Sequence, residues 1–125
     1  MDRESPHLPT PAAIEAYGKG GFRFGGMSHR GSLLCVPSGV WASPVTGPAD
    51  IDEKSFDLVW NETPAIAHCL IGSGRDPWIM SGRLRELFRA RHIAAETMTT
   101  GAAVRTYNIL LGERRRFAAL LIAVE

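Results

Sequence analysis

A buried strand that ends in a glycine turn is the feature that most restricts how this chain can fold. The apolar run over residues 65–71 leads into the turn Gly72–Asp76, and a helical pattern of leucine and phenylalanine follows over 81–91. Such a strand fits an α/β domain, in which the ends of buried strands border a ligand crevice. Its two glycines let the backbone turn sharply and leave N–H groups free near a helix start. The turn therefore predicts both the fold class and the position of a candidate site.

The C-terminal half continues this alternation of strand and helix. Strand-like segments over 94–98 and 116–124 flank a helix that Thr99 or Thr100 caps and Gly112 ends. The half from residue 65 is thus β-α-β-α-β, which predicts right-handed crossovers onto one sheet. Because its three strands are apolar without alternation, we expect them to be adjacent and covered by helices.

The N-terminal half is predicted to be richer in strands. Segments 14–17, 22–24 and 32–36 are separated by glycine-rich turns, as in an antiparallel β meander, and residues 40–41 suggest one more short strand. A helix over 53–61 is expected, capped by Asp50 or Asp52. Residues 1–13 contain three prolines and predict a flexible arm, so residues 14–125 form a single α/β domain.

Composition excludes several classes of protein. The longest apolar run, residues 117–124, is far shorter than the roughly 20 residues of a membrane span. Nothing in the sequence resembles a secretory signal, which favours a cytoplasmic protein. Residues 1–70 carry a net charge of −3 and residues 71–125 a net charge of +4. This asymmetry falls short of the basic stripe of a nucleic-acid-binding protein, so no nucleic acid partner is expected.

The chain lacks the residue patterns of a catalytic or metal site. Cys35 and Cys69 lie in separate apolar runs, do not have metal-ligand spacing, and are expected to be reduced. The glycine turn fits neither a dinucleotide-binding motif nor a P-loop, and the flanking of Ser73 by adjacent glycines does not fit a nucleophile elbow. We therefore expect no catalytic residue, cofactor or metal, and an enzyme is the less favoured class.

A second polar turn, Thr99–Gly101, follows the next strand and opens the next helix. Two such turns on neighbouring strands would border one cleft, with helix-start N–H groups that favour an anion or carboxylate. The candidate ligand-binding residues are Gly72, Ser73, Gly74, Arg75, Asp76, Thr99, Thr100, Gly101, Arg105 and Asn108. The alternatives are that the first turn is only structural and that Arg105 and Asn108 face water. Three arginines at 114–116 predict a solvated corner, with docking to an acidic partner as the alternative.

The segments Tyr17–Gly26, His29–Ser32, Leu70–Gly74 and Thr99–Asn108 together resemble a known family. It is a widespread family of small α/β domains that includes mitochondrial respiratory complex I assembly factor 3 and an adipogenesis-associated cytosolic protein. The resemblance covers residues 14–124 in matching order. It implies three layers with a mixed central sheet, and, for the mitochondrial relatives, a role in building complex I.

The resemblance carries over no catalytic residue, because none is established for the family. Two positions depart from its pattern: Ser73 replaces a frequent threonine, and Val104 replaces a frequent cysteine. The absence of a transit-like stretch suggests a bacterial member.

Two hypotheses about function follow. The favoured one is a non-catalytic assembly or interaction factor whose protein partner is a respiratory complex subunit. The other is a small-ligand-binding protein or enzyme that uses the cleft between the two turns, with a small anion as ligand.

Overall fold

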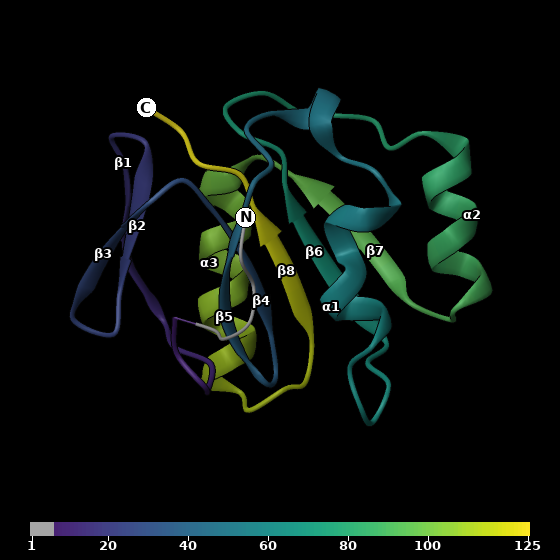
Figure 1. The fold of residues 1–125 in the computed structure, drawn as a ribbon, viewed down its shortest axis with the longest axis horizontal. Helices are drawn as coiled ribbons and strands as arrows, with labels where there is room; N and C mark the ends of the chain where they lie inside the picture. Colours follow the sequence, from purple (N-terminus) through teal and green to yellow (C-terminus); the bar gives the residue numbers. More distant parts are fainter. Residues whose placement is uncertain (1–6) are drawn as a thin grey trace.

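A mixed five-stranded sheet forms the centre of the protein in the computed structural model, which describes residues 7–125 (Figure 1). Its strand order is β5-β4-β8-β6-β7. β6 is parallel to both β7 and β8, whereas β4 is antiparallel to both β5 and β8. The strands are β4 (Ser32–Val36), β5 (Gly39–Ser43), β6 (His68–Gly72), β7 (Ala94–Met98) and β8 (Ala118–Leu121). The mixed sheet and the adjacency of its three C-terminal strands confirm the prediction.

A second, three-stranded antiparallel sheet comes from the N-terminal half. It consists of β1 (Ile14–Gly18), β2 (Gly21–Phe24) and β3 (Met27–Arg30). β3 was not predicted from the sequence, although its residues alternate between half-buried and exposed. Its signal is Gly25-Gly26, where both residues have positive φ (+56° and +74°), as a two-residue hairpin turn requires.

The helices lie on both faces of the central sheet. α3 (Thr100–Gly112) and the small sheet cover one face, while the short helices η2 (Glu53–Phe56) and α1 (Asp57–Trp60) and the longer α2 (Gly82–Ala90) lie over the other (Figure 1). A further short 3-10 helix, η1 (Pro48–Asp50), precedes them. Two hydrophobic cores result, one on each face, and the three-layer arrangement that was expected is present.

Side-chain caps set where the helices begin. Thr99 accepts a hydrogen bond from the Ala102 amide, and Ser81 accepts one from Leu84. Asp52 and Ser55 form a reciprocal capping box, so Asp52 rather than Asp50 is the cap. The helix expected over 53–61 is instead a 3-10 turn followed by a single α-turn.

Two expectations for the C-terminal half were wrong. β7 is an edge strand, and its Ala94 and Glu96 are exposed, so helices do not cover it fully. Its small and mixed side chains suit an edge better than a buried centre. The glycine turn also does not open directly into a helix, because a loop precedes the Ser81 cap of α2.

Part of the predicted N-terminal arm contacts the domain. Leu8 forms an isolated bridge with Val40 of β5, and the Ala12 carbonyl accepts a hydrogen bond from the Tyr107 hydroxyl. Residues 1–6 of the predicted arm lie outside the described residues, and the division at residue 14 stays a prediction. Over residues 7–125, no helix has the length and hydropathy needed to cross a membrane.

Candidate functional site

The two polar turns predicted from the sequence lie side by side. The Thr100 amide donates to the Gly74 carbonyl at 2.8 Å, and the Gly74 amide donates back to Thr100 Oγ1 at 2.9 Å. These bonds join the end of β6 to the start of α3. We call Gly72–Asp76 together with Thr99–Gly101 the glycine junction.

The Thr100 hydroxyl also connects the junction to β8. It donates to the Ile122 carbonyl at 2.7 Å, and the Ile122 amide donates to Gly72 at 3.0 Å. Thr100 is 0% exposed, so its hydroxyl bonds to these protein groups instead of to water. The residue therefore holds two strand ends and a helix start in one arrangement.

Ser73 is engaged in the same way. Its amide donates to the Met98 carbonyl at 2.8 Å, and its hydroxyl lies within hydrogen-bonding distance of the Met98 and Asp76 carbonyls. The Ala102 amide is taken by the Thr99 side chain. The N–H groups of Ser73, Gly74 and Thr100 in the predicted turns, and that of the adjacent Ala102, thus donate to acceptors inside the protein.

Close packing explains the glycines of the junction. A Cβ on Gly72 would lie 3.0 Å from the Ala103 Cβ and 3.1 Å from the Thr100 Cα, so glycine lets α3 approach β6 closely. A Cβ on Gly101 would lie 2.5 Å from the Tyr17 hydroxyl of the small sheet. Gly74 has φ +102°, a conformation that L side chains rarely adopt.

The remaining predicted residues divide into two groups. Arg75, Asp76 and Arg105 are exposed. Asn108 instead connects α3 to β1, since its side chain accepts from the Ile14 amide and donates to the Ile14 carbonyl, both at 2.9 Å. It is therefore a structural contact rather than part of the junction. Ligand binding at the junction stays a prediction that depends mainly on the two arginines.

A second site, which the sequence analysis did not find, lies at the opposite end of the sheet. It is a cleft of about 390 Å³ near the C-terminal end of α3. We call it the arginine cleft; it is lined by Pro11, Cys35, Val36, Pro37, Tyr107, Leu111, Arg114, Arg115, Arg116 and Phe117. The triple arginine is visible in the sequence, but the apolar floor comes from β4, α3 and Phe117, just before β8, and requires the fold.

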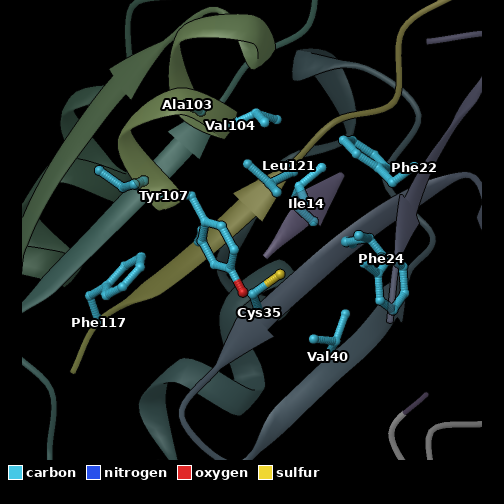
Figure 2. Packing of buried hydrophobic residues seen from close by; sticks show 13 residues of the cluster. Ile14, Phe22, Phe24, Cys35, Val40, Ala103, Val104, Tyr107, Phe117 and Leu121 are labelled. Atoms are coloured by element: carbon cyan, nitrogen blue, oxygen red, sulfur yellow. The ribbon is translucent and has the colours of Figure 1, made fainter. Parts of the chain in front are cut away.

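The floor of the arginine cleft is buried and uncharged. Figure 2 shows the Tyr107 hydroxyl pointing toward the Cys35 sulfur, with Phe117 beside the tyrosine ring. The two rings meet edge to face, with centroids 5.4 Å apart. Burial raises the pKa of the Cys35 thiol to about 12 and the pKa of Tyr107 well above its ordinary value. Both groups are therefore neutral near pH 7, and this thiol is a poor nucleophile.

The rim of the cleft carries three exposed arginines with different partners. Arg116 donates to the Pro64 carbonyl at 2.9 Å and lies 3.5 Å from the Glu62 carboxylate. Arg115 lies 3.8 Å from Glu113. Arg114 has no acidic partner within residues 7–125, which leaves the rim electropositive.

The cysteines and other potential ligands give no further site. Cys35 and Cys69 belong to different cores, on opposite faces of the central sheet, and both thiols are free. Their redox state in the cell stays a prediction. In the described part of the chain, no three His, Cys, Asp or Glu side chains are grouped so that they could hold a metal ion.

Curated relatives include proteins with and without an assigned role. The chain is 35% identical over 122 residues to an uncharacterized protein of Rhodobacter capsulatus, covering 98% of this chain and 93% of that protein. It is 29% identical over 109 residues to NADH dehydrogenase [ubiquinone] 1 alpha subcomplex assembly factor 3 of Xenopus tropicalis. That match covers 87% of this chain but only 60% of the assembly factor.

Solved structures show the same fold. The Rpa2829 protein of Rhodopseudomonas palustris is 52% identical with a TM-score of 0.83, covering 99% of this chain and 93% of that one. A Bartonella henselae protein, described as an outer membrane protein, is 48% identical with a TM-score of 0.90. The match covers 95% of this chain and 100% of that protein.

The sequence profile of one family matches residues 14–122, which is nearly the whole α/β domain. Its description is a protein of unknown function, in agreement with the uncharacterised family that the sequence resembles. The chain belongs to this family, DUF498/DUF598.

Proposed function

We propose that this protein is a non-catalytic assembly or interaction factor, and that its partner is a subunit of respiratory complex I. The observation that carries the proposal is the similarity to assembly factor 3, which extends over 109 residues rather than over one short motif. The match covers 87% of this chain, so most of the domain is related in sequence to that protein.

The chemistry of the glycine junction supports a binding role over a catalytic one. The hydroxyls of Ser73 and Thr100 are buried and hydrogen-bonded to backbone carbonyls. Such groups fix the fold, and among residues 7–125 both hydroxyls are hydrogen-bonded to backbone groups rather than to a side-chain base. Burial likewise raises the thiol pKa of both cysteines, which disfavours the reactive thiolate.

The proposal is tested by deleting the gene in its native organism and measuring assembled complex I. We expect less fully assembled complex on native gels, lower NADH:quinone oxidoreductase activity in membranes, and restoration of both by the wild-type gene. Succinate dehydrogenase provides the matched control, because its assembly should not change. Unchanged amounts and assembly rates of complex I in the deletion strain would exclude the proposed role.

The alternative is a small-ligand-binding protein or enzyme that uses the glycine junction. Its main remaining support is the exposed pair Arg75 and Arg105, since the amides of Ser73, Gly74 and Thr100 donate within the fold. The cytoplasmic location also stays a prediction. Fractionation of cells with an antibody to the protein would test the location directly.

A further inference from the structure

We propose that the arginine cleft binds a free acyl carboxylate, with the hydrocarbon chain against the apolar floor and the carboxylate at Arg114. This site is separate from the glycine junction and does not depend on the assembly role. Three features of the cleft support the proposal: the chemistry of its floor, the unpaired charge on its rim, and the volume between them.

The floor offers carbon surface without free polar groups. The Tyr107 hydroxyl donates to the Ala12 carbonyl at 3.0 Å and is hydrogen-bonded to the Cys35 thiol, so the polar atoms of both are satisfied. Pro11 and Pro37 on the walls have no backbone N–H. A polar ligand placed here would lose its hydrogen bonds to water without replacement, whereas a hydrocarbon chain gains from leaving water.

The rim offers a guanidinium that has no acidic partner among residues 7–125. The two neighbouring arginines each have a carboxylate within 4 Å, but Arg114 does not. Arg114 also has φ +60°, directly after the Glu113 cap of α3, where glycine is the usual residue. A guanidinium matches a carboxylate through two parallel hydrogen bonds, which makes a carboxylate its natural ligand.

The volume between floor and rim selects the size of the ligand. The cleft measures about 390 Å³, which is in the lower part of the range of small-molecule sites. Acetate would leave the floor uncovered, and a neutral hydrocarbon would leave Arg114 unpaired. A medium-length acyl carboxylate satisfies both regions at once.

The proposal is tested by titrating the isotope-labelled full chain with hexanoate, octanoate and decanoate below their micelle concentrations, and following amide NMR shifts. We expect shifts centred on Cys35, Leu111 and Phe117, and an affinity that rises at least tenfold from hexanoate to decanoate because methylenes are buried. Decanol should bind about fivefold more weakly than decanoate. Shifts centred elsewhere, an affinity independent of chain length, or equal binding of decanol and decanoate would each overturn the proposal.

A pair of arginine variants tests the contact with the carboxylate. Arg114→Ala should weaken decanoate binding about fivefold and leave decanol binding unchanged, since only the carboxylate uses the guanidinium. Arg89→Ala, an exposed arginine on α2 across the sheet, is the matched control and should change neither. Wild-type decanoate affinity in Arg114→Ala would show that Arg114 is not the carboxylate partner. Because the ligand series uses the wild-type chain, that test does not depend on either variant folding.

Discussion

The two ends of the central sheet use polar residues in opposite ways. At the glycine junction, the Thr100 hydroxyl and the turn amides bond to one another and to Ile122. At the arginine cleft, the floor is apolar and the charged groups are exposed on the rim. The first end joins strands to a helix, and the second leaves Arg114 without an acidic partner in the described part of the chain. A polar motif therefore indicates a binding site only where its donors are not already used by the fold.

The largest expected effect comes from removing the hydroxyl at the centre of the junction. Thr100→Val keeps the shape of the side chain but leaves the Gly74 amide and the Ile122 carbonyl without that partner. Burying unsatisfied groups of this kind costs about 1–3 kcal/mol each, so we expect the free energy of unfolding to fall by about 3 kcal/mol in urea denaturation.

Thr106→Val, at a half-buried position of the same helix, is the control for this change. Its expected effect is within about 0.5 kcal/mol. A similar loss in the two variants would show that the junction is not especially important for stability, which would weaken the contrast between the two ends.

The next largest effect tests the close packing of α3 on β6. In Gly72→Ala, the new Cβ would lie 3.0 Å from Ala103, so the helix must shift, at a cost of about 2 kcal/mol. Gly82→Ala is the matched control, because nothing lies within 4 Å of its Cβ and alanine favours the helix. The control is expected to be neutral or stabilising by up to about 1 kcal/mol. Equal unfolding free energies for both variants would contradict the packing argument.

Sequence reasoning predicted most of the fold because local patterns and topology agree in the C-terminal half. Apolar runs mark β6 and β8, and Thr99 and Ser81 mark the starts of α3 and α2. It failed where neighbours decide the outcome. Periodicity does not show that β7 lies at an edge, and β3 depends on pairing with β2 rather than on its own residues.

The candidate sites show the same limit. The sequence placed the two polar turns together, since both follow parallel neighbouring strands, and the structure brings them into contact. It could not show that the Thr100 amide would donate to the Gly74 carbonyl and the Gly74 amide to the Thr100 hydroxyl. It also could not predict the arginine cleft, whose floor joins residues as distant as Cys35 and Phe117.

A third prediction compares anion binding at the two ends. Because the amides of Ser73, Gly74 and Thr100 donate within the protein, Arg75 is the principal charged donor, and Arg75→Ala should weaken sulfate binding there by about 1.5 kcal/mol in calorimetry. The same variant should leave decanoate binding unchanged. Arg114→Ala, in contrast, should weaken decanoate binding and leave sulfate binding at the junction unchanged. Wild-type sulfate affinity in Arg75→Ala, or sulfate located first at residues 114–116 in a soaked crystal, would remove the anion-site hypothesis for the junction.

The smallest expected effect is a pH dependence around His29, whose ring nitrogen lies 3.2 Å from the carbonyl of Ser32 at the start of β4. His29 is partly buried, its ring centroid lies 4.6 Å from that of His7, and burial followed by the charge of His7 lowers its pKa below 6.5. The fold therefore favours the neutral imidazole. Its contribution to stability is complete above about pH 6.5 and is lost as the pH falls from 6.5 through the lowered pKa.

Hydrogen exchange locates this loss within the molecule. His7 and Leu8 bond to Val40 through their backbones, and the same segment leads to Pro11 and Ala12 at the cleft. Lowering the pH from 7.5 to 5.5 should reduce protection of the Val40 amide, which donates to Leu8, more than protection of the Gly74 amide. His29→Gln should abolish this difference, because glutamine does not titrate. Equal loss of protection at both amides would mean that acid weakens the whole domain rather than the contacts around His29.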